Sequence, residues 1–261
     1  MTQIKFDGEW HAGIVANLED AFLQECVNIC HDKQKLLNFK RNNIFCKVIG
    51  NDIRRKDISD VWYNFLENTE LMEDIAKYKN NDAVGNPLFY SYEKTGMISP
   101  GTLCFLSVLQ DIKTRLVDPK GKRVCEIGSG YGGQANIILK YGVKSMDLID
   151  RPQTLALAKK YLSLYKHSNV SFHNTESIEA KEYDLVVSNW CLSELDRKGM
   201  QFYIDNVIKT CNHGYFLINF RDESKQQWMI DELSKNFSKV ILEEENPPTN
   251  EIKNYVLLCS K

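Results

Sequence analysis

The sequence lacks a long run of apolar residues at any point along its 261 positions. A transmembrane helix needs about 20 mostly apolar residues, and no segment approaches that length. The opening residues Met1–Asp7 also lack the apolar core of a secretory signal. We therefore expect a cytoplasmic protein with no membrane span.

Paired cysteines are missing as well. The eight cysteines include no C-x-x-C pair, and Cys26 and Cys30, beside His31, are the only two that lie close together. A zinc site needs a second pair at similar spacing, and a radical-type iron–sulfur motif needs a third cysteine that is absent here. The pattern predicts reduced thiols, partly buried as small apolar side chains, and no metal site.

The sequence also lacks an excess of charge of either sign. Lys and Arg number 33 against 35 Asp and Glu, so the formal net charge is -2. Domains that bind nucleic acid are usually basic, so we expect no nucleic-acid partner. The hydrophobic fraction of 43% and the length are typical of a soluble protein with one large domain, or one domain and an appendage.

What the sequence does contain is a strand, a glycine turn and a helix in succession. Residues 124–127 read as a short buried strand, and a helix opens at Ala135. Glycines allow a sharp turn and let a ligand approach backbone N–H groups without meeting a Cβ. Four glycines lie between strand and helix, at Gly128, Gly130, Gly132 and Gly133.

Two cofactor motifs fit this turn. Gly128, Gly130 and Gly133 match the dinucleotide pattern G-x-G-x-x-G, which is a weak signal alone. Together with Glu126, the glycines also match the acidic-x-G-x-G-x-G pattern of class I S-adenosylmethionine-dependent methyltransferases. A carboxylate at the strand end repels the pyrophosphate of a dinucleotide, whereas it suits a ligand with an α-ammonium and a sulfonium. Glu126 therefore favours S-adenosylmethionine.

Beyond the turn, predicted strands and helices alternate. This alternation is typical of a parallel sheet covered on both faces, and the last two strands have no helix between them, so they should form an antiparallel hairpin. The sequence thus predicts an α/β, Rossmann-like class I methyltransferase sheet of seven strands. After residues 124–127, we expect strands at 145–150, 170–173, 183–189, 215–219, 239–242 and 254–259, and helices from 152 to 162, 193 to 211 and 223 to 237.

The first 98 residues are less regular and read as a mainly helical extension. Helices are predicted over residues 18–37, 57–66 and 69–78, and a stretch rich in turn formers follows. Ser99-Pro100 is a helix start, with serine as N-cap and proline at the first position. We place the methyltransferase domain at residues 99–261. The extension, residues 1–98, is expected to act as a lid that binds the acceptor, through Asn86, Tyr90 and Tyr92.

In open α/β sheets, ligands bind at the carboxyl ends of the strands, where the strand order reverses. Asp150 ends the second strand and is positioned to accept hydrogen bonds from ribose hydroxyls, although it could also cap the next helix. Glu176 follows the third strand and is a candidate for the adenine amine. Asn189 and Trp190 end the fourth strand and should lie on the sulfonium side, with Trp190 facing the acceptor. Inside and after the glycine turn, Ser129, Tyr131 and Gln134 are further candidates for contact with the cofactor.

Several segments resemble a bacterial family of sugar O-methyltransferases. The resemblance extends from about residue 50 to the C-terminus and implies S-adenosylmethionine as cofactor and a sugar hydroxyl as acceptor. One departure is Ser129, where the family usually has glycine. The matching segments are residues 82–87, 99–103, 126–134, 148–150 and 188–195, of which Gly-Tyr-Gly-Gly-Gln and Ser-Asn-x-x-x-Ser-Glu-Leu are the most particular.

A sugar hydroxyl is a poor nucleophile at neutral pH, so a general base should assist its methylation. Glu194 is the first candidate because it starts the helix after the fourth strand, although a first-turn glutamate can also serve only the helix dipole. His173 and Asp222 are the reserves, and His213 precedes its strand and so lies at the wrong end of the sheet.

Three function classes remain open from the sequence. The first is an S-adenosylmethionine-dependent O-methyltransferase that acts on a sugar or a glycosylated substrate. The second is a methyltransferase for another small molecule, with an oxygen or nitrogen acceptor. The third is an NAD-dependent oxidoreductase that uses the glycine turn as a dinucleotide motif.

Overall fold

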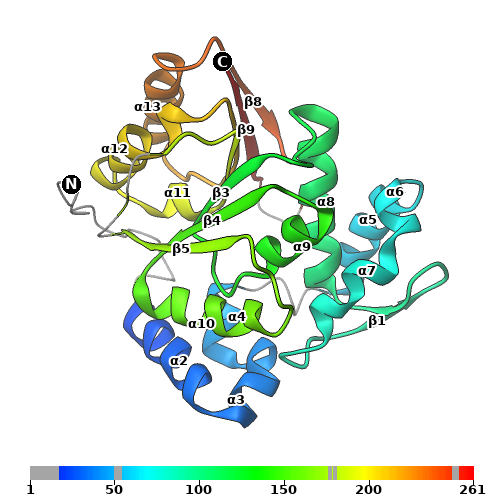
Figure 1. Ribbon diagram of the computed structural model, residues 1–261. Coiled ribbons are helices and arrows are strands. Elements are labelled where there is room, and N and C mark those ends of the chain that lie inside the picture. The colour runs from blue at the N-terminus through cyan, green and yellow to red at the C-terminus, as the bar shows by residue number, and fades with distance from the viewer. Residues whose placement is uncertain (1–17, 50–54, 176–177, 179–180, 249–252) are drawn as a thin grey trace.

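The computed structural model describes residues 18–49, 55–175, 178, 181–248 and 253–261. Its centre is a seven-stranded sheet in the order β5-β4-β3-β6-β7-β9-β8 (Figure 1). All neighbouring strands are parallel except β9, which runs antiparallel to both β7 and β8. This confirms the predicted sheet with its terminal hairpin. The strands are β3 (Arg123–Ile127), β4 (Ser145–Asp150), β5 (Val170–Asn174), β6 (Leu185–Asn189), β7 (His213–Ile218), β8 (Lys239–Glu244) and β9 (Tyr255–Ser260).

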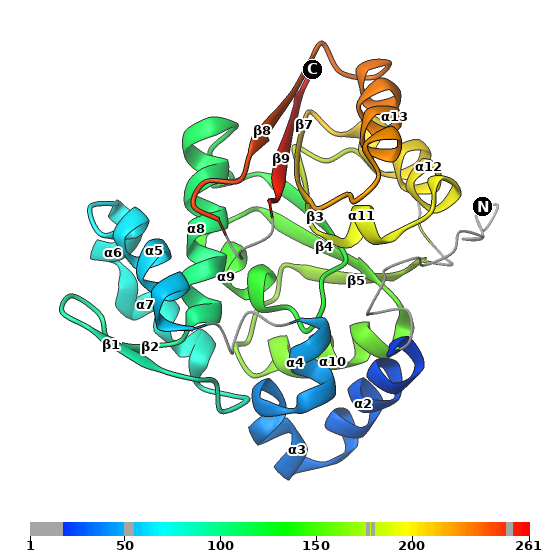
Figure 2. The same ribbon diagram turned by 180° about the vertical axis from the view of Figure 1, so that it is seen from behind.

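Helices cover both faces of the sheet, as Figures 1 and 2 show. Successive residues of a strand point to opposite faces, so Val124 belongs to one hydrophobic cluster and its neighbour Cys125 to the other. One face packs against α8 (Pro100–Arg115), α9 (Gly133–Tyr141) and α10 (Pro152–Ser163). The other packs against α11 (Cys191–Glu194), α12 (Arg197–Asn206) and α13 (Glu223–Ser234).

The N-terminal part packs on the first of these faces. Helix α2 lies along α10 and α5 along α8, and their apolar side chains join the same cluster as the sheet, so both parts share one core. Its helices are α2 (Glu19–His31), α3 (Lys33–Asn38), α4 (Asn43–Val48), α5 (Lys56–Leu66), α6 (Glu70–Glu73) and α7 (Ile75–Lys79). The described residues also form a small hairpin of β1 (Tyr90–Tyr92) and β2 (Gly96–Ile98) and 3-10 turns at Phe39–Arg41, Asn80–Asp82 and Ile208–Thr210.

Three predicted helices are wrong in their continuity. The helix expected over residues 18–37 is divided at Asp32, whose carboxylate accepts from the backbone N–H groups of Gln34 and Lys35 and so begins a new helix. The helix expected over 69–78 is divided at Asp74. The helix expected over 193–211 ends after Glu194, and Asp196 caps α12 by accepting from Gly199 N.

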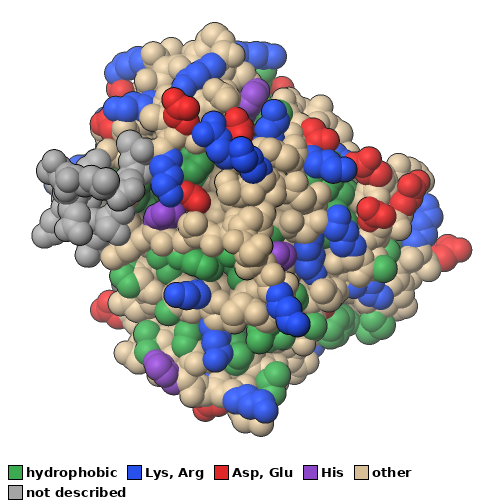
Figure 3. All heavy atoms as spheres, viewed as in Figure 1, with side chains coloured by type: hydrophobic (Ala, Val, Ile, Leu, Met, Phe, Trp, Pro, Cys, Tyr) green, Lys and Arg blue, Asp and Glu red, His purple; other side chains and the backbone are tan. Residues whose placement is uncertain are grey.

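The described part of the chain gives no sign of a metal or disulfide framework. All eight cysteines lie within it, and no disulfide joins any two of them. Among the described residues, no three His, Cys, Asp or Glu side chains come together as a metal site would require. Within the same residues, no helix is both long enough and apolar enough to cross a bilayer. On the face shown in Figure 3, Lys and Arg side chains are scattered over the surface, and acidic side chains lie mainly in its upper part and at its right edge.

Candidate active site

The glycine turn joins β3 to α9 with a backbone that only glycine adopts easily. Gly128, Gly130 and Gly132 have φ values of 77°, 54° and 87°, in the left-handed region. At Gly128 the space is also closed, because an added Cβ would lie 2.3 Å from the Cβ of Cys191. The turn therefore brings the backbone against the start of α11, at the junction of β3 and β6.

Glu126 is the buried carboxylate beside this turn. It is only 2% exposed, and its Oε2 has no hydrogen-bond partner among the described residues. Burial, with a smaller contribution from the negative charge of Asp150, raises the pKa of Glu126 well above its ordinary value. A buried carboxyl group without a partner is costly unless a ligand supplies one. The position therefore suits a ligand that carries a hydrogen-bond donor or a positive charge.

Asp150 lies at the end of β4, next to the turn. Its Oδ2 accepts from Gly130 N at 3.0 Å and its Oδ1 from Arg151 N at 2.7 Å. Burial raises the pKa of Asp150 to about 6, although these two N–H groups act in the opposite direction. Because a carboxylate has about four acceptor positions, Asp150 can hold the turn in place and still accept from a ligand hydroxyl. The alternative of a simple helix cap is weakened, since the N-cap of α10 is Arg151.

The end of β6 adds further polar atoms that have no partner in the described residues. They are Ser188 Oγ, Asn189 Oδ1 and Trp190 Nε1, and each of these three atoms is buried. Trp190 has a φ of 63°, a left-handed conformation that is strained for a bulky residue and is found mainly at functional sites. The sequence pointed to Asn189 and Trp190, whereas Ser188 carried no separate signal as a site residue.

Around the turn, the other predicted cofactor residues differ in their surroundings. Ser129 is buried and its Oγ has no described partner, so it fits the site. Gln134 Nε2 donates a hydrogen bond to Phe105 O at 3.1 Å, whereas its Oε1 has no described hydrogen-bond partner. Tyr131 packs instead among aromatic rings, with Phe39 at 5.2 Å and Tyr161 at 5.0 Å between ring centres. Glu176 lies outside the described residues.

Residues of the N-terminal part other than the predicted Asn86, Tyr90 and Tyr92 cover the glycine turn. Ile49, at the end of α4, has its Cδ1 3.2 Å from where a Cβ on Gly130 would lie. Beneath it, the fully buried Lys40 donates through Nζ to Asn81 O at 2.9 Å and lies 5.1 Å from the centre of the Tyr131 ring. The turn is therefore held from outside by residues that precede the sheet by about 80 positions in the chain.

The predicted acceptor residues of the extension are not brought together with β6. Tyr92 stacks on Tyr63 at 4.4 Å and donates to Ser59 Oγ, so it is fixed on α5. Tyr90 lies in the same hairpin, at the outer edge of the molecule in both ribbon views. Asn86 is exposed and donates to Asn38 Oδ1. Trp190 is the predicted acceptor residue that does lie at the strand ends.

The candidate general bases differ in their contacts and in their exposure to solvent. His173 lies 3.1 Å from Asp147 and is held there. Asp222 is exposed and caps α13 by accepting from Ser224 N. Glu194 is half-buried, and burial raises its pKa to about 7, while the nearby charge of Arg151 lowers it and that of Asp150 raises it. Glu194 combines partial burial with a pKa suited to proton transfer at neutral pH, and it lies just after the end of β6.

Comparison with known proteins gives similarities of fold. The chain matches no protein-family model and no curated protein sequence. Similar solved structures include an S-adenosylmethionine-dependent methyltransferase from Mesorhizobium loti, with 11% identity, a TM-score of 0.48, and coverage of 58% of this chain and 96% of that one. Another is the N-methyltransferase NodS from Bradyrhizobium japonicum WM9 in complex with S-adenosyl-L-homocysteine, with 19% identity, a TM-score of 0.45, and coverage of 60% and 84%.

A third is the methyltransferase domain of bacterial CtHen1, with 12% identity, a TM-score of 0.48, and coverage of 60% of this chain and 97% of that one. At such identities a shared fold does not transfer an acceptor or a reaction. We therefore base the function on the side chains of the site.

Proposed function

We propose that the protein is an S-adenosylmethionine-dependent methyltransferase that transfers the methyl group to a hydroxyl of a sugar or a glycosylated small molecule. The observation that carries the proposal is Glu126, a buried carboxyl group with an unpartnered oxygen directly beside the glycine turn. Asp150 at the end of the neighbouring strand β4 supports it. The seven-stranded, mostly parallel sheet with its antiparallel β9 has the strand directions that the sequence predicted for a class I methyltransferase sheet.

Taken together, the residues of the site fit S-adenosylmethionine. Glu126 would hold the α-ammonium, Asp150 the ribose hydroxyls, and Ser129 and Asn189 supply polar atoms that have no partner among the described residues. The dinucleotide alternative fits less well, because a pyrophosphate at the turn would meet the carboxyls of Glu126 and Asp150. An oxidoreductase therefore remains the weaker proposal.

When bound, S-adenosylmethionine supplies a methyl group that its sulfonium has already activated. The protein must then hold the acceptor oxygen in line with that carbon and exclude water. The end of β6 is suited to the first task, since the strained Trp190 and its indole N–H lie there. Glu194 is proposed to take the proton of the hydroxyl.

The sugar acceptor is the finer part of the proposal and rests on the resemblance of residues 82–87, 99–103, 126–134, 148–150 and 188–195 to sugar O-methyltransferases. A non-sugar acceptor with an oxygen or nitrogen nucleophile is the alternative, because the fold hosts many acceptors. A screen of methyl transfer to glycosides and to non-sugar phenols and amines separates the two.

Calorimetry tests the methyltransferase proposal directly. We expect saturable binding of S-adenosylmethionine and S-adenosylhomocysteine to the full chain, and no binding of NAD under the same conditions. The physical reason is that the first two ligands would bring an α-ammonium to Glu126, whereas NAD would bring its anionic pyrophosphate to the turn. Binding of NAD without binding of S-adenosylhomocysteine would overturn the proposal in favour of the oxidoreductase.

The second prediction concerns Asp150, which we expect to govern cofactor affinity. Replacing Asp150 by asparagine keeps the size but weakens acceptance from two ribose hydroxyls, and hydrogen bonds to a charged group are worth about 1.5–3 kcal/mol. The dissociation constant for S-adenosylhomocysteine should rise by about 10- to 100-fold. In the wild type, affinity should also fall as the pH drops through about 6, where the carboxylate becomes protonated.

This pH dependence should be absent from Asp150→Asn, and calorimetry at several pH values measures both effects. Asp222→Asn is the matched control, because Asp222 is exposed and caps a helix away from the turn. An unchanged dissociation constant in Asp150→Asn, with normal thermal unfolding, would remove Asp150 from the site.

A further inference from the structure

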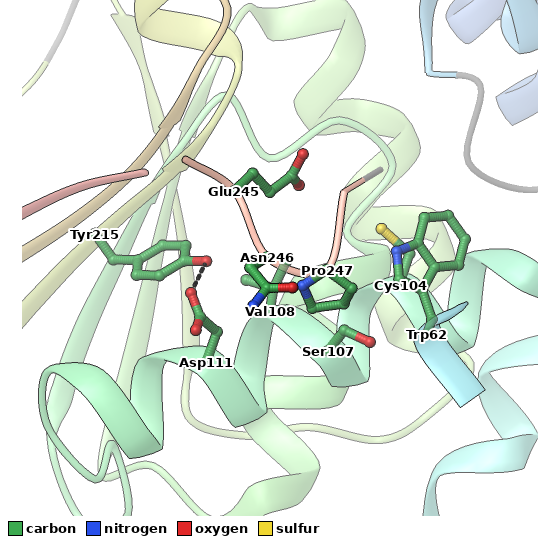
Figure 4. A pocket seen from close by; sticks show the side chains of 9 residues that line it. All are labelled: Trp62, Cys104, Ser107, Val108, Asp111, Tyr215, Glu245, Asn246 and Pro247. Carbon is green, nitrogen blue, oxygen red and sulfur yellow. Dashed lines mark hydrogen bonds between the residues drawn. The ribbon is translucent and has the colours of Figure 1, made fainter. Parts of the chain in front are cut away.

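A small pocket lies on the α8 face of the sheet, under the turn that follows β8 (Figure 4). Trp62 of α5, Ser107 of α8 and Glu245 and Asn246 of the turn line it. Its empty volume of about 240 Å³ includes open solvent, and its enclosed part has room for about one water-sized group. The pocket is therefore of the size of one polar substituent and not of a whole ligand.

Trp62 gives this pocket an unused hydrogen-bond donor. The side chain is completely buried, yet its indole Nε1 has no partner among the described residues. In Figure 4 the nitrogen edge of the indole faces the turn that carries Asn246. A buried N–H without an acceptor is costly, so its persistence in a lined pocket points to a group that enters and accepts from it.

The other side chains that line the pocket determine which kind of ligand group it can bind. Ser107 Oγ donates to Leu103 O and keeps its lone pairs, and Asn246 brings both a donor and an acceptor. Glu245 and Asp111 also line the pocket, so an anionic group would meet two carboxyls. An ammonium group has no lone pair to offer to the Trp62 N–H. A neutral hydroxyl, which both donates and accepts, satisfies these walls.

The register of the sheet places the pocket beside the expected site of methyl transfer. Glu126 pairs with Val187 of β6, and Val187 pairs with Tyr215 of β7, which lines the pocket. These three side chains point to one face, and two strand spacings put Glu126 and Tyr215 about 10 Å apart. Asp150 lies on β4, on the opposite side of β3. Since the ribose would lie beside β4, the pocket lies on the other side of β3, where an acceptor could bind.

We propose that this pocket, between Trp62, Ser107 and the turn of Glu245 and Asn246, binds one hydroxyl of the methyl acceptor. It rests on the proposed function and deepens it, because it names a neutral polyhydroxylated compound as the class of acceptor. The hydroxyl in the pocket is not the one that is methylated. It accepts from Trp62 Nε1 and donates to Ser107 or Asn246, which orients the rest of the acceptor over the ends of β6 and β7.

The indole N–H signals provide a direct test. The chain has four tryptophans, and in the ¹⁵N-labelled protein with S-adenosylhomocysteine bound, Trp62→Phe identifies the signal of Trp62. We titrate neutral methyl glycosides, such as methyl α-D-glucopyranoside, and use methoxycyclohexane as a probe without hydroxyls. At least one glycoside should shift the Trp62 signal saturably, while methoxycyclohexane should leave it in place.

Two substitutions extend the test beyond chemical shifts. Trp62→Phe keeps the ring and removes the N–H, and it should weaken binding of that glycoside by about three- to tenfold. Trp228→Phe is the matched control, since Trp228 packs with the cluster on the opposite face of the sheet. Asn246→Ala alters an exposed side chain, so this variant should fold normally, and it should also bind the glycoside more weakly.

The outcomes are distinct. A Trp62 signal that no glycoside moves, in a chain that binds S-adenosylhomocysteine normally, overturns the pocket, which then holds a structural water, and leaves the methyltransferase proposal intact. Unchanged affinity in both Trp62→Phe and Asn246→Ala also overturns it. Failure of the wild type to bind S-adenosylhomocysteine overturns the proposed function itself, and the acceptor pocket with it.

Discussion

Replacing Glu126 by glutamine should weaken binding of S-adenosylhomocysteine by about 10- to 100-fold and, at the same time, make the ligand-free protein more stable. The affinity loss follows because the α-ammonium loses a charged partner, worth about 1.5–3 kcal/mol. The gain in stability follows because burial raises the pKa of Glu126, so ionisation of this group disfavours the folded state. Calorimetry and thermal unfolding of the same two proteins measure both effects.

The pH dependence gives this prediction a definite sign. A raised folded pKa means that Glu126 contributes stability at low pH, and that this contribution is lost as the pH rises through the folded value. The melting temperatures of wild type and Glu126→Gln should therefore agree at low pH and diverge above it, with the variant higher. Binding of the ammonium should also release protons from the wild type, so the measured enthalpy should depend on the ionisation enthalpy of the buffer.

A matched control is available in Glu93, an exposed residue of the turn between β1 and β2. Glu93→Gln should change neither the affinity nor the melting temperature. If Glu126→Gln bound S-adenosylhomocysteine as the wild type does, Glu126 would have no role in the site. A gain of affinity for NAD in Glu126→Gln would agree with the proposal, because the variant no longer places a carboxylate against the pyrophosphate.

The sheet was largely predictable from the sequence, and so were the places of the candidate cofactor residues at its strand ends. The alternation of strands and helices predicted a parallel sheet, and the missing helix before residues 254–259 predicted its antiparallel end, whereas the order of the strands was not predicted. Because ligands bind where such strands end, the positions of Glu126, Asp150 and Asn189 followed from local sequence.

What the sequence could not show depends on contacts across long distances in the chain. No local pattern links Ile49 to Gly130, or Trp62 of α5 to Asn246 after β8. Short elements were also missed, because the hairpin of β1 and β2 has only three residues in each strand. The divided helices are a different case, since the capping roles of Asp32 and Asp196 are local signals that the apolar periodicity outweighed.

Glu194 has surroundings that suit a general base and also suggest a second role. Burial raises its pKa to about 7, in the range where a carboxylate can accept a proton from a hydroxyl at neutral pH. Its charged neighbours are Arg151, Asp150 and Glu19, which lie toward the end of β4 and α2. Asp150 is the residue proposed to hold the ribose, so cofactor binding is the competing role for Glu194.

Turnover and cofactor affinity of Glu194→Gln decide between the two roles. As a base, Glu194 contributes about 10²–10⁴-fold, so turnover of a glycoside acceptor should fall by that factor while the dissociation constant for S-adenosylhomocysteine stays nearly constant. The wild-type rate should rise as the pH passes about 7, where the carboxylate forms, and this rise should vanish in the variant. Glu223→Gln, in the exposed first turn of α13, is the control. Turnover close to that of the wild type, with weaker S-adenosylhomocysteine binding, would place Glu194 on the cofactor and leave proton removal to another group or to water.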